Sequence, residues 1–317
     1  MAVALITGVL GQDGSLLAES LLRKGYRVIG VARPESRPAI EGLEIVGVDL
    51  ARPSSPTWAT ELVQHYQPDE VYHLAACHRS SEPGAGDTPE QQQRMVTVNT
   101  TAALALAHAV LQRGRGALVL AGSSQMYTAR AAATRVDERT AFAPSTFYGV
   151  TKIGALDAVR WLREHQGLRG STAILFNHES PRRAPKFVSR KITRAAVRIA
   201  AGLERTLELS DLSSSVDFCA ASDVVEGLHA MATSDAPDER VFASGQLHTI
   251  SDLCDEAFRC VSLDWREHVT STQSAAERPS LVGDPSRAEQ ELGWRRKQSF
   301  AAWIAEMVEA DRAFLES

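Results

Sequence analysis

The chain has 317 residues, of which 44% are hydrophobic, and a formal net charge of −5 at pH 7. This size and composition predict a soluble globular protein with a large core, divided into two lobes around one cleft. The negative charge and scattered arginines argue against a nucleic-acid partner, and the apolar N-terminal stretch is too short for a signal peptide.

No stretch approaches the roughly 20 apolar residues of a membrane span, so we predict a cytoplasmic protein with no membrane partner. The four cysteines lack C-x-x-C spacing. Disulfides and structural zinc are therefore not expected, and no metal site is predicted.

Apolar strand-like runs alternate with helical patterns through the first half of the chain, which is typical of βαβ units and a parallel sheet. Helices are expected at roughly 13–24, 56–66, 90–113 and 146–165. We expect six strands, at Val3–Ile6, Arg27–Val31, Leu43–Val48, Glu70–Leu74, Ala117–Leu120 and Thr172–Phe176.

The pattern changes after Phe176. The predicted α/β fold is a doubly wound parallel sheet (Rossmann) over 1–176, with a smaller α/β substrate domain over 177–317 whose elements can interleave with it. In the second part we expect a helix near 188–202, loops at 213–215 and 234–238, and a closing amphipathic helix at 299–315.

A glycine-rich loop with G-x-x-G-x-x-G spacing, Gly8, Gly11 and Gly14, lies between the first expected strand and helix. Glycines let the backbone approach a pyrophosphate, whose charge the helix N-terminus stabilises. We predict a dinucleotide site here that includes Gln12 and Asp13, and an ordinary glycine-rich turn is the alternative. The spacing resembles the extended short-chain dehydrogenase/reductases.

The end of the second strand favours NADP over NAD. An NAD enzyme would have an acid there, whereas this chain has Arg33, with Arg37 nearby and Glu35 between them. A cation suits a 2′-phosphate, although an arginine on a solvated turn is the alternative. Asp49, after the third strand, is expected at the adenine or else as the N-cap of the next helix.

Tyr148 and Lys152 are one helical turn apart and share a face. A lysine ammonium beside a phenol favours the phenolate, so the pair predicts a usable base. Ser123, Ser124 and Gln125 stand before this pair, at the end of an apolar strand.

Together, several segments resemble the GDP-mannose 4,6-dehydratases over essentially the whole chain. They are ALITGVLGQDGS (4–15), HLAA (73–76), TVNTTAAL (97–104), YGVTK (148–152), FNHESPRR (176–183), FVSRKITRA (187–195) and GDPSRAEQELGW (283–294).

The resemblance implies that Tyr148 takes the proton from the sugar C4 hydroxyl while hydride passes to NADP, which gives a 4-keto sugar. Lys152 would lower the tyrosine pKa and hold the nicotinamide ribose, and Ser123 would hydrogen-bond the C4 oxygen. Asn99 would be structural. Leu74, Ala75 and Ala76 would lie at the cofactor.

For the substrate, the resemblance implies that Asn177 contacts the sugar diphosphate, and that the segment from Arg182 through Val188 to Lys191 shapes the nucleotide pocket and subunit contacts. Ser124 and Arg278 are further substrate candidates. His178 is expected to be structural rather than catalytic, and Glu179 and Arg183 to form a pair.

The chain departs from the family at Gln125, where the dehydratases have the Glu that removes the C5 proton and helps to expel the C6 hydroxyl. An amide has no accessible pKa near neutrality, so ordinary 4,6-dehydration is in doubt. Val216 replaces a phosphate-binding arginine, and the loop with Arg278 is shortened. Cys77-His78-Arg79 also differs from the family, whose residues at these positions face the sugar, so the resemblance makes His78 and Arg79 substrate candidates. His78 is either a replacement acid/base or a surface-loop histidine.

We therefore favour a GDP-sugar epimerase that oxidises C4 transiently. The alternatives are a 4,6-dehydratase in which His78 or a water substitutes for the Glu, and a reductase of 4-keto sugars that consumes NADPH. A dinucleotide sensor without catalytic activity is a further hypothesis, which the intact Ser123, Tyr148 and Lys152 disfavour. A homodimer or homotetramer is expected.

Overall fold

A computed structural model describes residues 1–36, 40–53, 55, 57–78, 88–129, 134–272 and 279–316. Arg37, Arg79 and Arg278 lie outside these residues. Their suggested roles therefore stay predictions.

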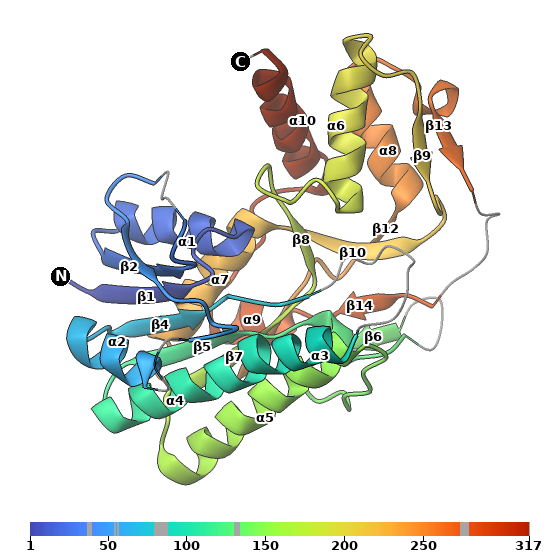
Figure 1. The fold of residues 1–317 in the computed structure, drawn as a ribbon. Coiled ribbons are helices and arrows are strands. Elements are labelled where there is room, and N and C mark those ends of the chain that lie inside the picture. Colours follow the sequence, from blue (N-terminus) through green and yellow to red (C-terminus); the bar gives the residue numbers. More distant parts are fainter. Residues whose placement is uncertain are drawn as a thin grey trace.

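A seven-stranded, all-parallel sheet in the order β11-β7-β5-β4-β1-β2-β3 is the centre of the larger lobe (Figure 1). All six expected strands are confirmed, with ends shifted by one or two residues. The strands are β1 (Val3–Thr7), β2 (Arg27–Ala32), β3 (Glu44–Gly47), β4 (Glu70–His73), β5 (Ala117–Ala121), β7 (Gly170–Leu175) and β11 (Glu239–Phe242).

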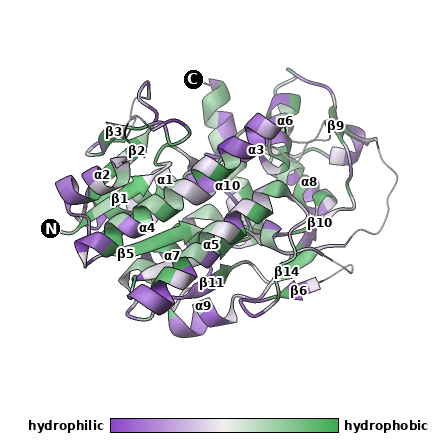
Figure 2. Cartoon of the chain, turned by 60° about the horizontal axis from the view of Figure 1, so that its bottom comes forward, coloured by the Kyte–Doolittle hydropathy of each residue, from purple (hydrophilic) through white to green (hydrophobic). Residues whose placement is uncertain are grey.

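Helices cover both faces of this sheet and bury its apolar side chains. Figure 2 shows that strands such as β1 and β5 are mainly hydrophobic, whereas the helices over them are mixed. On one face lie α1 (Gln12–Arg23) and α7 (Ala221–Thr233), and on the other α2 (Trp58–Tyr66), α4 (Ala102–Arg113) and α5 (Phe147–Gln166).

The expected helix at 90–113 is confirmed as one helical stretch of three parts: α3 (Pro89–Met95), the π-helix η1 (Val96–Thr101) and α4. By length and composition, these 25 residues could cross a membrane, which corrects the expectation that no stretch approaches that length. However, half of the most apolar part is buried, and α4 packs against α2 and α5. A core helix meets the same test, so the absence of a membrane partner stays a prediction.

Strand β11 was not predicted, because it begins with two charged residues. Glu239 and Arg240 are nevertheless only 6% and 3% exposed. The strand also follows residue 176, so the large sheet draws on both predicted segments of the chain.

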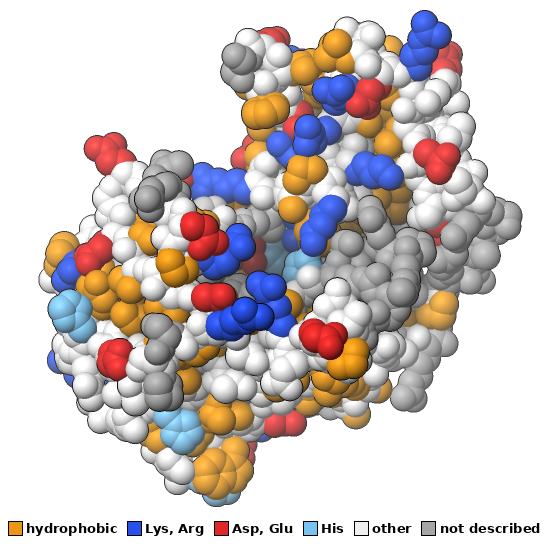
Figure 3. Space-filling model, in the orientation of Figure 1, with side chains coloured by type: hydrophobic (Ala, Val, Ile, Leu, Met, Phe, Trp, Pro, Cys, Tyr) orange, Lys and Arg blue, Asp and Glu red, His pale blue; other side chains and the backbone are white. Residues whose placement is uncertain are grey.

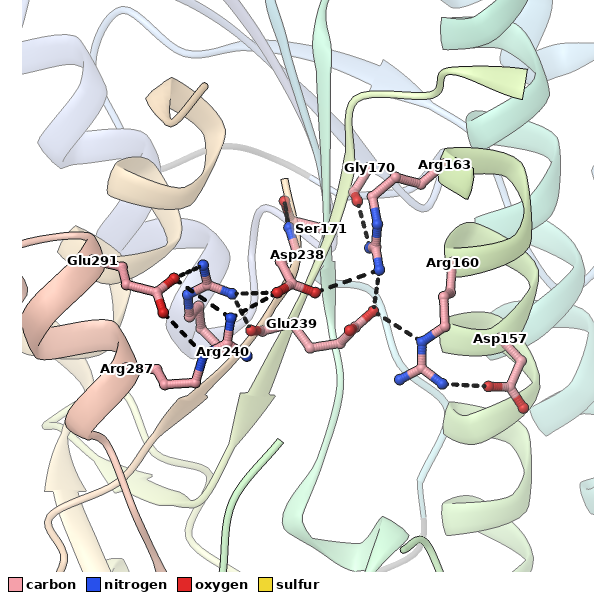
Figure 4. Close-up of polar contacts among 10 residues, drawn as sticks. All are labelled: Asp157, Arg160, Arg163, Gly170, Ser171, Asp238, Glu239, Arg240, Arg287 and Glu291. Carbon is pink, nitrogen blue, oxygen red and sulfur yellow. Dashed lines mark hydrogen bonds and ion pairs between the residues drawn. The ribbon is translucent and has the colours of Figure 1, made fainter. Parts of the chain in front are cut away.

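An ion-pair network neutralises these buried charges (Figure 4). Glu239 accepts from Arg163 of α5 at 2.9 Å, and Arg240 pairs with Asp238 at 3.0 Å and with Glu291 of α9 (Ser286–Glu291). Arginine forks that meet several carboxylates satisfy charges that would otherwise be costly to bury. The network therefore lets a charged segment form the edge of the sheet.

The smaller lobe is built on a three-stranded sheet in the order β12-β10-β8. Three helices pack on it around Phe218 and Trp303. Ser215 begins a strand, so the expected loop at 213–215 is one residue too long. These elements are β8 (Asn177–Glu179), β10 (Ser215–Ala220), β12 (Leu247–Thr249), α6 (Val188–Ala200), α8 (Ile250–Arg259) and α10 (Phe300–Glu316).

Two short strand pairs and two 3-10 turns complete the description. β9 (Leu207–Leu209) pairs with β13 (Val269–Ser271), and β6 (Thr134–Val136) pairs with β14 (Leu281–Gly283). The 3-10 turns are η2 (Ser124–Met126) and η3 (Trp265–Glu267).

Asp217 joins three segments of the smaller lobe. Its side chain is 1% exposed and accepts hydrogen bonds from the main-chain N–H groups of Ser244, Gly245 and Gly283 at 2.7 to 3.1 Å. The Ser244 hydroxyl donates a fourth bond at 2.6 Å. One carboxylate thus fixes β10 against the turn before β12 and against β14.

We predict that Asp217→Ala lowers the free energy of unfolding by at least about 3 kcal/mol, because three buried N–H groups lose their acceptor. Urea denaturation measures this change. Asp235→Ala, at an exposed loop residue, is the control and should stay within about 0.5 kcal/mol of wild type. A loss below about 1 kcal/mol for Asp217→Ala would contradict the assigned role.

Candidate active site

The glycine loop forms a tight turn against the end of β4. Gly8 has a φ of +71°, and a Cβ atom there would lie 2.6 Å from the main-chain nitrogen of Ala75. A Cβ on Gly14 would overlap the Gly8 carbonyl oxygen, and the N–H of Gly11 donates to that oxygen at 2.9 Å. Gly8 and Gly14 are therefore required sterically, and the cradle fits a dinucleotide pyrophosphate.

The expected cofactor residues after β4 lie beside this loop. The N–H of Leu74 donates to the Thr7 carbonyl at 3.2 Å, and that of Ala75 to the Thr7 hydroxyl at 3.4 Å. Ala76 follows and is exposed. The structure brings the loop and this segment together.

Asp13 forms a buried ion pair with His178 of β8. The histidine Nε2 donates to both carboxylate oxygens at 2.9 and 3.0 Å, while Nδ1 donates to the Phe176 carbonyl at 2.6 Å. Because both ring nitrogens meet acceptors, the ring is a doubly protonated imidazolium. His178 is thus structural, as predicted.

The pKa values of this pair follow from burial and mutual attraction. Burial favours the neutral forms, but the opposite charge and the hydrogen bonds outweigh it, so the pKa of Asp13 is lowered and that of His178 is raised.

Gln12 adds two further bonds between the loop and β8. Its Nε2 donates to the His178 carbonyl at 3.0 Å, and its Oε1 accepts from the Ser180 hydroxyl at 2.9 Å. The side chains of Gln12 and Asp13, which were predicted to bind the cofactor, therefore tie the loop to the smaller lobe.

The catalytic candidates Ser123, Tyr148 and Lys152 converge at the carboxyl end of β5. The Ser123 side chain is within hydrogen-bonding reach of Tyr148 and lowers the pKa of its phenol. Lys152 is 2% exposed, and its Nζ donates to the Ala121 carbonyl at 2.7 Å and lies 5.6 Å from the centre of the Tyr148 ring.

The expected lowering of the Tyr148 pKa by Lys152 is not found. Burial and the charge of Asp13 raise the pKa of Tyr148, and the groups that lower it are Ser123 and Arg183. The Lys152 ammonium is held on a main-chain carbonyl, and burial lowers its own pKa to about 8.

Gln125 stands next to the N-terminus of α5. The Thr146 hydroxyl accepts from the Gly149 N–H at 3.0 Å and donates to Oε1 of Gln125 at 3.0 Å. The amide is exposed. The position at which the resemblance implies a carboxylate thus holds an amide whose oxygen already has a donor.

Gly149 sets the distance between α5 and the turn at 123–125, because a Cβ atom there would overlap the main-chain oxygen of Gln125. Asn99 fixes the opposite side. It is 1% exposed, exchanges hydrogen bonds of 2.8 and 3.0 Å with the main chain of Cys77, and donates to Thr151 at 3.0 Å. Its predicted structural role is confirmed.

A row of side chains connects Tyr148 to the smaller lobe. The His78 ring lies edge-on to Tyr148 at 6.0 Å and to Phe187 at 5.6 Å. The Arg183 guanidinium lies over Phe187 at 3.7 Å, and its Nε is 3.1 Å from Glu179, so the expected pair is confirmed. Sequence reasoning missed that Arg183 is close enough to influence Tyr148, although the FNHESPRR motif contained it.

Two further cofactor candidates follow strands β2 and β3 of the larger lobe. Arg33 is two-thirds exposed and lies 3.5 Å from Glu35. Asp49 accepts from the Ala51 N–H at 3.0 Å and does not cap α2, whose N-cap is Thr57, so that alternative is wrong.

The substrate candidates lie on β8, η2, α6 and the segment before α6. Asn177 is exposed, Ser124 is half-buried, Val188 packs on the core of the smaller lobe and Lys191 is exposed. Arg182 donates to Glu19 of α1 at 2.6 Å and so pairs across the lobes, and its role in a nucleotide pocket stays a prediction. Within the described ranges, no cluster of three His, Cys, Asp or Glu could hold a metal.

Comparisons with known proteins agree over nearly the whole chain. The family model described as GDP-mannose 4,6 dehydratase matches residues 5–307. GDP-mannose 4,6 dehydratase 1 of Arabidopsis thaliana is 36% identical, over 98% of this chain and 89% of that relative. GDP-mannose 4,6-dehydratase of Sinorhizobium fredii is 32% identical, over 99% and 97%.

Solved structures show the same fold. UDP-glucose 4-epimerase of Thermotoga maritima, with UDP-glucose, has a TM-score of 0.83 at 19% identity and covers 99% of both chains. RMD from Pseudomonas aeruginosa, complexed with NADPH, has a TM-score of 0.78 at 20% identity, over 99% of this chain and 100% of that one.

We predict that Gly149→Ala destabilises the protein by about 1–3 kcal/mol, because the added methyl group forces α5 away from the turn at 123–125. Chemical denaturation measures the loss. Gly154→Ala on the same helix is the matched control: its Cβ would lie 3.4 Å from a Thr100 methyl group, so it should be neutral or stabilise by up to about 1 kcal/mol. Equal effects of the two variants would refute the close approach.

The ion pair of Asp13 and His178 should make stability depend on pH. The raised pKa of His178 increases the free energy of unfolding. This increase is complete below about pH 6.5 and is lost as the pH rises through the histidine pKa of the folded state. The lowered pKa of Asp13 also increases the free energy of unfolding. This second increase is complete above about pH 4 and is lost on further acidification.

We therefore expect Asp13→Asn to cost about 3–5 kcal/mol near pH 6, and less at alkaline pH, where His178 loses its charge. Denaturation from about pH 5 to about pH 9 measures the trend. Glu226→Gln, which removes a half-exposed pair with Lys24, is the control and should cost about 1 kcal/mol or less. A penalty for Asp13→Asn that does not change with pH would show that the pair is uncharged.

Proposed function

Because this chain belongs to the GDP-mannose 4,6-dehydratase family, we propose that it is an NADP-dependent enzyme that modifies GDP-linked sugars through transient oxidation at C4. The observation that carries the proposal is the convergence of Ser123, Tyr148 and Lys152 beside the glycine loop. Figure 3 shows Lys and Arg side chains around the hollow between the lobes. Their positive charge would suit two anionic ligands, the cofactor and the GDP-linked sugar.

The cofactor would lie on the glycine loop, with its adenosine end toward Arg33 and Asp49. When bound, it supplies hydride transfer from and to the sugar. The exposed Arg33 directly after β2 supports NADP rather than NAD, because its charge is available to a 2′-phosphate.

The residues of the chain handle the proton. Tyr148 takes the C4 hydroxyl proton, and the hydrogen bond with Ser123 favours the phenolate and directs the C4 oxygen. Lys152, with a pKa of about 8, stays largely protonated at neutral pH and has donors for the ribose.

Gln125 leads us to favour epimerisation over dehydration. A C4 ketone acidifies the protons at C3 and C5, so epimerisation needs only a modest base, whereas dehydration also needs an acid for the leaving hydroxyl. An amide supplies neither. With Oε1 held by Thr146, Gln125 offers a substrate only the N–H donors of its amide.

Dehydration is the second candidate, because the curated relatives named above are dehydratases and His78 stands beside Tyr148. A neutral imidazole can remove the C5 proton and then donate it to the leaving C6 hydroxyl. Reduction of a 4-keto sugar is a third candidate that needs only Ser123, Tyr148 and Lys152.

We also propose a cytoplasmic homodimer or homotetramer. Leu104 of α4 and Val150 and Trp161 of α5 are large apolar side chains with 37%, 49% and 51% exposure, which supports a subunit contact on these helices. Val150 and Trp161 are about three turns apart and share a face. Sedimentation at the mass of one chain would contradict the assembly.

The proposed function is tested by incubating the protein with GDP-mannose and with other GDP-linked sugars, in deuterated water, with NADP+, NAD+ or NADPH. Mass spectrometry then separates the candidates. We expect deuterium gain on an unchanged skeleton without net NADPH consumption. Loss of one water would support dehydration, and net reduction the reductase.

Tyr148→Phe is the control for this assay and should lower turnover by at least about 100-fold. Retained turnover would exclude the proposed base.

We predict that Gln125→Glu raises 4,6-dehydration by about 100-fold or more, because a carboxylate restores the missing acid/base group. The measurement is the rate of water loss from GDP-mannose. Gln125→Met, which is of similar size but carries no titratable group, should give no gain. A wild-type protein that already dehydrates GDP-mannose rapidly would refute the role assigned to Gln125.

A further inference from the structure

A second hollow lies on the smaller lobe, away from the cofactor loop. Its volume is about 440 Å³, and its wall includes Arg295, Arg296, Lys297, Gln298, His248 and Phe300. We call it the basic hollow. In the sheet order β12-β10-β8, His248 belongs to β12, whereas His178 and Asn177 belong to β8. Strand β10, whose Phe218 and Cys219 also line the hollow, lies between β12 and β8, so the basic hollow and the proposed substrate residues are on opposite sides of this strand in the sheet order.

The basic hollow carries an excess of positive charge. Arg295 donates to the main-chain carbonyls of Glu289 and Trp294 at 2.7 and 2.8 Å. Neither it nor Arg296 or Lys297 forms an ion pair with another described residue. Two acids oppose this charge: Glu289, which also lines the hollow, and Glu226, whose pKa Lys297 helps to lower.

Asp223 fixes the main chain of the segment 295–298, which carries the three cations. One carboxylate oxygen of Asp223 accepts from the N–H groups of Lys297 and Gln298 at 2.9 and 3.1 Å. The buried Trp294 donates its indole N–H to the Asp223 carbonyl at 2.7 Å. A ligand that meets these side chains would find the backbone already ordered, which lowers the cost of binding.

The hollow also offers an aromatic surface and an acceptor. The rings of His248 and Phe300 stack at 3.8 Å with an angle of 8°. The Oε1 atom of Gln298 is buried and accepts no hydrogen bond within the described part of the chain, whereas its Nε2 donates to Glu306 at 3.0 Å. Buried acceptors are normally satisfied, so a ligand O–H or N–H would complete this site.

We propose that the basic hollow binds a nucleoside diphosphate. Arg296 and Lys297 contact the phosphates, the base stacks on the pair of His248 and Phe300, and Gln298 accepts from a hydroxyl or base N–H group. Cations recognise the phosphates, the stacked rings select an aromatic group, and the two features lie on one wall.

The test counts GDP sites by isothermal titration calorimetry on the full chain. We expect two sites in the wild type, one in each pocket, and a single site in the variant Arg296→Glu/Lys297→Glu. The control, Arg23→Glu/Arg205→Glu, changes the net charge equally at exposed arginines elsewhere and should keep two.

This design separates the present inference from the proposed function. If the GDP-sugar site were absent, the wild type would bind one GDP and Arg296→Glu/Lys297→Glu none. Wild-type stoichiometry and affinity in Arg296→Glu/Lys297→Glu would overturn the basic hollow as a binding site.

Two further measurements keep the test sharp. Arg296→Gln/Lys297→Gln, a milder change for use if charge reversal impairs folding, should weaken GDP at the second site at least about tenfold. His248→Ala should weaken GDP there about threefold or more while leaving inorganic pyrophosphate unchanged. An unchanged GDP affinity in His248→Ala would overturn the assigned base contact.

Discussion

The buried ion pair between Asp13 and His178 is the interaction on which the geometry of the site depends. It joins the glycine loop, which belongs to the large sheet, to β8 of the smaller sheet. Because the imidazolium also donates to the Phe176 carbonyl, the end of β7 is fixed by the same ring. Without this pair, a loop and a strand from different sheets would be held mainly by Gln12 and by packing.

The catalytic group depends on a second constraint, the close approach of α5 to the turn after β5. Gly149 has no side chain to keep these segments apart, and Thr146 bonds to both of them. This places the Tyr148 hydroxyl against Ser123. Burial there raises the pKa of Tyr148 and so opposes the phenolate. Ser123 and Arg183 lower this pKa, and they matter more than the nearby Lys152.

The sequence pattern predicted the elements that depend on residues close together in the chain. Apolar runs predicted six strands, and the glycine spacing predicted the loop at 8–14. Strand β11 could not be predicted in this way, since Glu239 and Arg240 are buried only because arginines and carboxylates from α5 and α9 meet them in the fold. The partners of Asp13 and Arg182 were hidden for the same reason: His178 and Glu19 are more than 160 residues away in the chain.

The residues that depart from the family pattern would act after the oxidation at C4, whereas the residues for the oxidation itself match the pattern. Ser123, Tyr148, Lys152 and the glycine loop, to which the proposed function gives the oxidation at C4, match the family pattern and lie together in this structure. Gln125 keeps the geometry of its position but not the chemistry, because Thr146 holds an amide there as it would hold a carboxylate. His78 is the titratable group that faces Tyr148 from the other side. Among the described residues, we therefore propose that proton transfer after the C4 ketone forms falls to His78, Tyr148 itself or solvent, which suffices for the modest base that epimerisation needs.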